Sequence, residues 1–300
     1  MLAQAVNAYL TLRRACGFKL RGEGYLLRSF AAFSAARDQH CVGTNIAIEW
    51  AGLTPSPIHR ARRLAAVIRF ARHIRAEEPG HELPPPYYRS PRSVRPVPYI
   101  LSHSDVRRLV EAVSQFKGLR GDTYSTLFSL LACTGLRKSE AIALRYDDIS
   151  TDGLVIRQTK FRSSRLVPLH ETARTALQDY IERRHPCAPF DDHVFISSTG
   201  KPLGLTDVDR AMRTAALKIG LPVGRGRPRP TPHSFRHSFA VRSLQTCPDG
   251  RDRIAQHTMA LSSYLGHRSV ESTYWYLEAT AELMTDIAER GEDFFKAGKP

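Results

Sequence analysis

Apolar residues recur at helical spacing over most of the chain. In one stretch Leu64, Val67, Ile68, Ala71 and Ile74 would share one face of a helix. This stripe predicts a helix that buries the face in a core. The same spacing predicts helices over Leu2–Cys16, Gly22–Arg37, Thr44–Ala51, Pro57–Arg75, Tyr124–Thr134, Glu171–Arg184, Thr206–Ile219, His233–Gln245 and Arg253–Leu265.

Two local signals predict further helix starts. Ser102 precedes an apolar-periodic stretch, and Asp105 follows three residues later, which is close to a capping box. The segment TGLRKSEAIALR, residues 134–145, also reads as the start of a helix. Its first turn would hold Arg137 and Lys138, where the helix dipole disfavours cations. Such a cation is either incidental or is held there to meet an anion.

The period of the apolar pattern changes in the segment GLVIRQTKFRSSRLVPL. Alternation there predicts two strands, Leu154–Thr159 and Arg165–Leu169, joined by a polar turn. Helical spacing resumes after this hairpin. The pattern as a whole predicts a mostly α fold with a small β-hairpin or sheet, in the α+β class, and not a doubly wound sheet.

A proline-rich stretch divides the chain. Seven prolines fall between Pro79 and Pro98. Proline lacks the backbone donor that a helix or sheet interior needs, so this stretch is expected to be extended. We therefore predict a helical domain over residues 1–80, a linker over 81–98, and a second domain over 99–300 that ends in a tail.

The strongly positive net charge of the chain indicates nucleic-acid binding. The formal net charge is +15, and residues 1–95 carry 15 Lys and Arg against 6 Asp and Glu. Basic residues are spread along the chain rather than gathered in one amphipathic segment, which disfavours membrane-surface binding. Arg62 and Arg69 point away from the apolar stripe of their helix. A solvated face is the simple explanation for each, and contact with DNA is the alternative that the charge of the segment favours.

The sequence lacks the motifs that are typical of several other functional classes. The chain starts without a secretory signal pattern, and no apolar run is long enough to span a bilayer. Five scattered cysteines form no CxxC pair and read as free thiols in a reducing cytoplasm. There is no GxxxxGK[ST] phosphate loop and no carboxylate cluster suited to two-metal catalysis.

Four features along the second domain need a joint explanation. They are an arginine beside a glycine, a lysine at the hairpin tip, a His-x-x-Arg pair on one helix face, and the segment YLGHRSVESTYWY. Each has a simple alternative, such as pairing of Arg137 with Glu140 or solvation of Lys160. Tyr274 and Tyr276 lie about 200° apart on a helix, so at most one of them can address a given site, and core packing is the alternative for both.

These features in this order resemble the tyrosine recombinases, the phage integrase family. TGLRKSEAIALRYDDI is similar to the first arginine box of that family, TKFRSSRLVPL to its lysine hairpin, HSFRHSFA to its His-x-x-Arg box, and LGHRSVESTYWY to its histidine and tyrosine box. The family's nucleophile lies nine residues after the last histidine, which selects Tyr276 over Tyr274. The YWYLEAT ending resembles recombinases that bacterial transposable elements carry.

The resemblance implies a catalytic domain preceded by a helical core-binding domain, and a role for six residues. Tyr276 would be the nucleophile, Lys160 the general acid, and His233 an acid–base partner. Phosphate and transition-state stabilisation would fall to Arg137, Arg236 and His267. Contacts with DNA would come from Arg62, Arg69, Arg162 and Arg165.

The resemblance also implies the reaction and the partners. The enzyme would cut and rejoin double-stranded DNA through a 3′-phosphotyrosine intermediate, as a homotetramer on two sites, with no cofactor, no metal and no ATP. A dimer on one site and accessory or sister recombinases are the variants of this assembly. The cytoplasm of a bacterium, at the nucleoid, is the expected location. A type IB topoisomerase-like nicking-closing enzyme and a non-catalytic DNA-binding protein are the alternatives.

Overall fold

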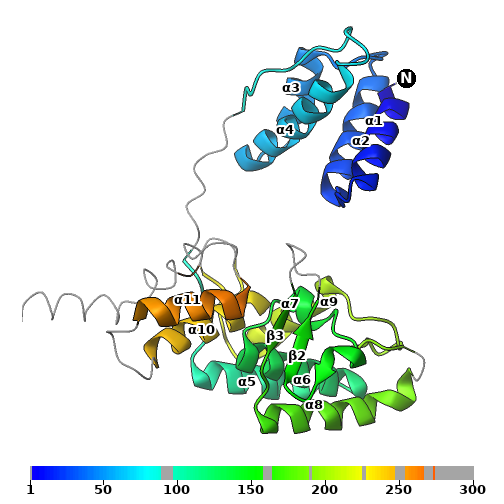
Figure 1. Cartoon of the computed structure of the whole chain (residues 1–300). Coiled ribbons are helices and arrows are strands. Elements are labelled where there is room, and N and C mark those ends of the chain that lie inside the picture. Colours follow the sequence, from blue (N-terminus) through cyan, green and yellow to red (C-terminus); the bar gives the residue numbers. More distant parts are fainter. Residues whose placement is uncertain are drawn as a thin grey trace, which may run out of the picture. The chain divides into compact units, whose positions relative to one another are not determined.

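The computed structural model of the chain describes residues 2–88, 97–157, 164–188, 191–224, 228–246, 254–266 and 273. It divides into two compact units, Met1–Arg95 and Pro96–Pro300 (Figure 1). Within the described residues the fold is mostly helical with one small sheet, which confirms the predicted class. No helix among these residues is both long and apolar enough to cross a membrane.

The first unit is a helical bundle around an aromatic core. Trp50 and Phe30 lie edge to face with ring centroids 5.4 Å apart, and Tyr9 and Phe70 do the same at 5.5 Å. Ser56 caps the longest helix by accepting a hydrogen bond from the amide of the third residue after it. The helices are α1 (Leu2–Ala15), α2 (Arg21–Ala35), α3 (Thr44–Gly52) and α4 (Pro57–Ile74).

Residues 81–88, expected in the linker, belong to the first unit and bond to its helical part. The buried imidazole of His81 accepts a hydrogen bond from the amide of Val42 at 2.9 Å. The hydroxyl of Tyr88 donates to the carbonyl oxygen of Ile48 at 3.1 Å. Proline keeps this stretch extended, but its other side chains still anchor it.

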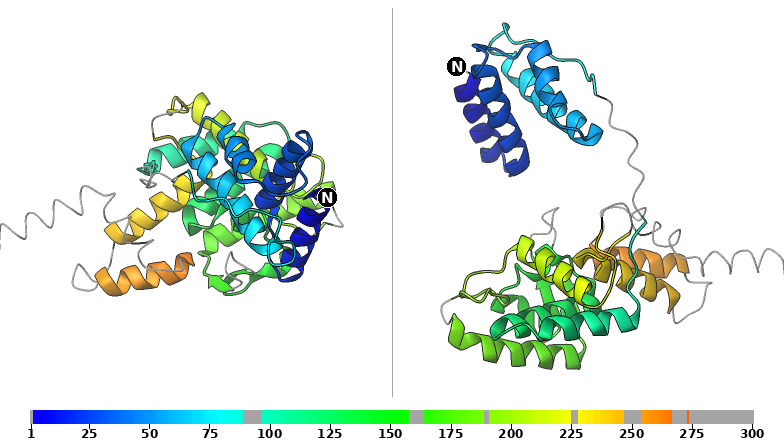
Figure 2. Two further views of the ribbon diagram at one scale, coloured as in Figure 1. Left: turned by 90° about the horizontal axis from the view of Figure 1, so that it is seen from above. Right: turned by 180° about the vertical axis from the view of Figure 1, so that it is seen from behind.

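The second unit is built around α6. Leu127, Phe128 and Leu131 on this helix are fully buried, and the ring of Phe128 lies 5.2 Å from that of Phe235. Figures 1 and 2 show two later helices, α10 and α11, side by side in this unit. Its helices are α5 (His103–Ser114), α6 (Leu119–Thr134), α7 (Lys138–Ala141), α8 (Glu171–Arg184), α9 (Leu205–Lys218), α10 (Pro232–Gln245) and α11 (Ile254–Leu265), with 3₁₀ turns η1 (Tyr146–Asp148) and η2 (His185–Cys187).

The sheet has three antiparallel strands where the sequence predicted two. They are β1 (Ile149–Ser150), β2 (Gly153–Ile156) and β3 (Arg165–Val167), in the order β1-β2-β3. In the β2–β3 pair Ile156 lies opposite Arg165. The two-residue β1 shows no alternating pattern of its own, so only its pairing with β2 reveals it.

Residues 134–145 contain a helix end as well as a helix start. Gly135 closes α6 in the left-handed conformation, at φ 61°, and its amide donates to the carbonyl oxygen of Leu131. The predicted end of this helix at Thr134 is therefore confirmed, and glycine adopts the left-handed conformation at no steric cost. The next helix, α7, begins at Lys138. Further upstream, the predicted capping box at the start of α5 is present.

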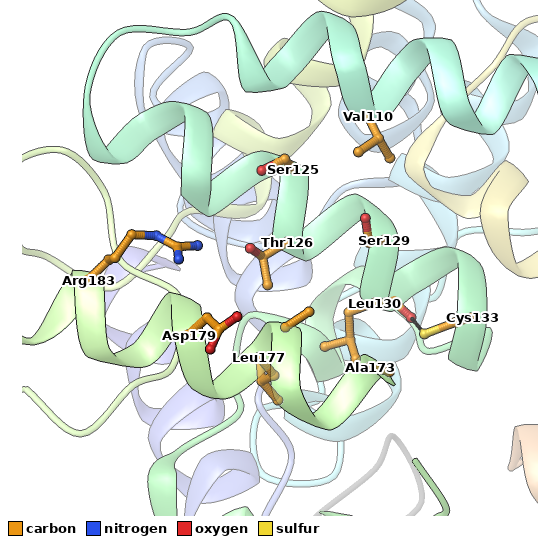
Figure 3. Close-up of a pocket in the computed structure, with 11 residues that line it drawn as sticks. Val110, Ser125, Thr126, Ser129, Leu130, Cys133, Ala173, Leu177, Asp179 and Arg183 are labelled. Atoms are coloured by element: carbon orange, nitrogen blue, oxygen red, sulfur yellow. Dashed lines mark hydrogen bonds between the residues drawn. The ribbon is translucent and has the colours of Figure 1, made fainter. Parts of the chain in front are cut away.

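A pocket of about 290 Å³ lies between α5, α6 and α8 (Figure 3). Small and apolar side chains line most of it, with Asp179 and Arg183 on α8 at one side. None of the predicted catalytic residues that the structure describes lines this pocket. The described candidate catalytic residues lie elsewhere in the second unit.

Candidate active site

Arg236 marks the centre of the candidate site. Its side chain is only 1% exposed, which is costly for a cation unless oxygens surround it. One terminal nitrogen donates to the carbonyl oxygen of Gly135 at 2.9 Å, and the other to that of Leu265 at 2.6 Å. These oxygens belong to the C-terminal ends of α6 and α11, where the helix dipoles favour a positive charge. The fold thus holds Arg236 between two helix ends.

Arg137 lies at the N-terminal side of α7, as the residue that caps it rather than in its first turn. Its Nη1 donates to Glu140 Oε1 at 2.7 Å, and its Nη2 to the carbonyl oxygen of Gly266 at 2.9 Å. The side chain is 24% exposed. A guanidinium has five N–H donors, so Arg137 keeps donors for an anion outside these two bonds.

Glu140 is shared between two arginines. Its carboxylate also accepts from Arg165, at 3.1 Å to Oε1 and 2.8 Å to Oε2, and from the amide of Arg137 at 3.0 Å. Burial alone would raise the pKa of the carboxyl. Hydrogen bonds from Arg165 and from the Arg137 amide, with the charge of Arg165, outweigh burial and lower the pKa to about 2. Glu140 is therefore ionised near pH 7.

Arg137, Arg165 and Arg236 all donate hydrogen bonds to the C-terminal end of α11. The carbonyl oxygens of three successive residues, 264 to 266, accept hydrogen bonds from Arg165, Arg236 and Arg137 in that order. Gly266 makes this possible because it adopts φ 66° and leaves room for the guanidinium of Arg165. Gly266 directly precedes His267.

His233 completes the described part of the site. Its imidazole is open to solvent on one side and crowded by protein on the other. Burial and then the charges of Arg236, Arg137 and Lys138 lower its pKa from 6.5 to about 4. The ring is thus neutral near pH 7 and can accept a proton.

The pKa of His233 predicts how the protein responds to acid. Because folding lowers this pKa, the unfolded chain binds the extra proton between about pH 6.5 and pH 4. The contribution of His233 to stability is therefore complete above pH 6.5 and is lost as the pH falls through 4. We expect the C2–H resonance of His233, assigned with a His233→Gln variant, to titrate near pH 4. A midpoint at or above 6.5 would contradict the positive field.

Lys138 is distinct from Arg137 although the two are adjacent. Its amine lies 2.5 Å from a carboxylate oxygen of Asp209 on α9, and 29% of its side chain is exposed. From the sequence, a cation at this position was either incidental or held there to meet an anion. The pairing with Asp209 ties α7 to α9.

The structure brings Arg137, His233 and Arg236 together and places Arg165 beside them. Arg165 was predicted to contact DNA, but three protein oxygens already bind its guanidinium. Four further predicted residues lie outside the described part of the chain, so their roles stay predictions: Lys160, Arg162, His267 and Tyr276. The two predicted DNA contacts of the first unit, Arg62 and Arg69, lie on α4.

Sequence reasoning underestimated Glu140. It treated the pairing of Glu140 with Arg137 as an alternative to a functional role, whereas the structure makes the pair part of the site. The spacing of three residues was the available signal. The involvement of Arg165 had no local signal, because its partners lie 25 and 99 positions away.

The arrangement is suited to a phosphate group. Two arginines and a neutral histidine converge on one site, and a carboxylate keeps one arginine in place. Planar guanidinium groups bind two oxygens of a phosphate at once and never lose their charge. The site can therefore stabilise negative charge that develops on phosphate oxygens.

Comparison with known proteins gives a consistent result. Residues 100–282 match the model of the phage integrase family. The chain is 37% identical to y4rB of Sinorhizobium fredii, an integrase/recombinase by its name, over 96% of each protein. It is 28% identical to the tyrosine recombinase XerD of Caulobacter vibrioides, over 78% of this chain and 75% of that protein.

Solved structures show the same fold. The Tn1549 transposon integrase in complex with transposon right end DNA superposes with a TM-score of 0.64 at 18% identity, over 96% of this chain and 98% of that one. The XerH site-specific recombinase bound to palindromic difH substrate, in a post-cleavage complex, has a TM-score of 0.63 at 17% identity, over 90% of this chain and 78% of that one. At such identity the likeness concerns the fold.

Proposed function

The chain belongs to the phage integrase family and is a site-specific DNA recombinase of the tyrosine type, and from this premise we propose that Tyr276 is its nucleophile. The Tyr276 hydroxyl attacks a phosphorus of the DNA backbone, and the bond to the 5′-oxygen breaks. Lys160 donates the proton that the departing 5′-oxygen needs. The phosphate stays on Tyr276 as a 3′-phosphotyrosine until a second 5′-hydroxyl attacks it and restores the backbone.

One observation carries this proposal: Arg137, Arg236 and His233 surround one site, and two of them are held by the residues directly before His267. The transition state of the transfer carries extra negative charge on the non-bridging oxygens. Preorganised cations stabilise such charge strongly, because they need no reorganisation during the reaction. Arg137, Arg236 and His267 supply this stabilisation, and the exchange of one phosphoester for another needs no ATP.

His233 acts as the proton acceptor of Tyr276. A base must be unprotonated at the working pH, and the lowered pKa of His233 provides this. When a phosphate binds between the arginines, its negative charge offsets part of their field and raises the pKa of His233. The histidine can then hold the proton during transfer and return it when the phosphotyrosine is resolved.

The first unit contributes DNA affinity through α2 and α4. A methyl group at Gly22 would lie 3.2 Å from a terminal nitrogen of Arg62, so the Arg62 side chain lies over α2 at a position without a side chain. Arg69 on α4 forms two hydrogen bonds of 3.1 Å with Glu23 on α2. Tyr25, which is 75% exposed, adds an aromatic side chain on α2. Arginines with an exposed aromatic suit a nucleic-acid surface.

Arg62→Ala should weaken DNA binding more than Arg69→Ala. Arg62 makes no ion pair with any described residue, whereas the charge of Arg69 is partly neutralised by Glu23. On a random-sequence duplex we expect the slope of log Kd against log salt concentration to fall by about one for Arg62→Ala. Glu23→Gln, which releases Arg69, should strengthen binding. An unchanged slope for Arg62→Ala would remove this residue from the interface.

The proposed assembly is a homotetramer on two DNA sites, which cuts one strand of each duplex at a time. The mobile element that encodes the protein supplies the sites, and the bacterial cytoplasm is the proposed location. Residues 274–300, which include the C-terminal tail, lie outside the described part of the chain.

A plasmid assay tests the function. Two copies of the element end are placed on one plasmid, and recombinant products are counted after incubation with the protein. We expect products that depend on both copies. Relaxation of supercoils that is independent of these sites, without joined products, would instead identify a nicking-closing enzyme.

A further inference from the structure

Arg165 at the start of β3 has a more complete set of protein partners than a DNA-contacting arginine needs. All three of its nitrogens donate to protein oxygens: Nε to the carbonyl of Tyr264 at 2.8 Å, and Nη1 and Nη2 to the two oxygens of Glu140. Only 12% of its side chain is exposed. Each of its nitrogens already has a protein acceptor, which leaves Arg165 few donors for a DNA backbone.

The charge balance of the site depends on Arg165. Without Arg165, Glu140 and Arg137 would form a pair with no net charge, and the electrostatic attraction between that pair and a phosphate would be weak. With Arg165 present, one carboxylate is shared by two guanidinium groups, so the three side chains carry a net positive charge. Glu140 then holds the Arg137 side chain in place, and the cluster still carries a positive charge.

Arg165 also joins two elements that carry the site. Through Glu140 it contacts α7, which Arg137 caps, and through Tyr264 it contacts the end of α11. A Cβ at Gly266 would lie 2.9 Å from Arg165 Nη1. Glycine at position 266, directly before His267, therefore leaves free the space that the Arg165 guanidinium occupies.

We propose that Arg165 is a positioning residue for the strand-transfer reaction: it keeps Arg137 aimed at the scissile phosphate and docks the end of α11 against α7 and β3. It does not contact the DNA. The inference rests on the proposed function of the same site, because it assigns a role in that reaction.

Cleavage kinetics separate positioning from DNA contact. The probe is a nicked duplex bearing the end of the element that carries the gene, at saturating concentration. For Arg165→Met we expect the single-turnover cleavage rate to fall about 100-fold, since small misplacements of a catalytic group have this effect. The Kd for the duplex and its salt dependence should stay unchanged. A weaker Kd with a salt slope lower by about one would overturn the proposal in favour of DNA contact.

Arg174→Met is the matched control. Arg174 is likewise held by protein oxygens: it donates to the backbone carbonyls of Ser150 and Thr151, and 16% of its side chain is exposed. It lies outside the cluster of Arg137, Glu140 and Arg165. The two variants should lose similar thermal stability, but only Arg165→Met should lose cleavage. Equal loss of cleavage in both, restored at lower temperature, would make Arg165 merely structural.

A double variant tests the charge argument. If Arg137 is neutralised by Glu140 once Arg165 is gone, then adding Glu140→Gln to Arg165→Met should restore part of the cleavage rate. Independent structural losses would add instead. Arg165→Lys keeps the charge but not the three-bond geometry, and we expect an intermediate rate. A double variant slower than both single variants would contradict the shared-carboxylate account.

The titration of His233 gives a readout that needs no DNA. Arg137 is one of the charges that lower the pKa of His233, so drawing Arg137 onto Glu140 should raise that pKa in Arg165→Met. The Arg174→Met control should leave it unchanged. If the wild-type protein fails to cleave the duplex, the proposed substrate is wrong, yet the titration still decides the role of Arg165. An identical His233 midpoint in wild type and Arg165→Met would overturn it.

Discussion

Replacement of Tyr276 by phenylalanine should abolish the covalent protein–DNA adduct. The substitution removes one hydroxyl and keeps the ring, so the fold should persist while the nucleophile is lost. The measurement uses a nicked duplex bearing the element end, labelled on the 3′-phosphate side of the cut. Wild type should give a labelled band that resists SDS, and Tyr276→Phe should give none.

Tyr274→Phe is the control for this assignment. It removes the same group two residues earlier, on the opposite side of the expected helix. The adduct should form at the wild-type rate. An adduct that persists in Tyr276→Phe and disappears in Tyr274→Phe would exchange the two roles. Absence of an adduct in all three proteins on the correct site would reject catalysis itself.

Arg137→Ala should separate DNA cleavage from DNA binding. Loss of one preorganised donor at a transition state reduces the rate by about 100- to 1,000-fold. Binding should persist, because most affinity comes from phosphate contacts over the whole interface. The fold should also persist, because Arg165 still pairs with Glu140 and no buried charge is orphaned. Single-turnover cleavage and duplex Kd, measured on one preparation, check the separation.

Arg236→Ala provides the contrast. It removes a buried guanidinium that satisfies the carbonyls of Gly135 and Leu265, so thermal stability should fall together with cleavage. Arg137→Lys keeps a charge but not the fork, and its cleavage rate should lie between wild type and Arg137→Ala. If Arg137→Ala lost binding and cleavage equally, Arg137 would be a structural residue.

Local patterns along the chain predicted most of the fold, and the resemblance to a family predicted the members of the site. Apolar spacing predicts the helices because burial selects one face of each, and the hairpin follows from a change of period that needs only neighbouring residues. The order of the boxes selected Arg137, Lys160, His233, Arg236, His267 and Tyr276. These signals lie within short windows, so a sequence alone can carry them.

Tertiary structure decided how the arginines are held and which of them share a carboxylate. Arg137 reaches Gly266 across 129 positions, and Arg165 reaches Tyr264 across 99. No periodicity encodes such bonds, because they depend on where the ends of α6 and α11 meet. The amino acids thus determined which groups are present, and packing of the helix ends determined the field they make together.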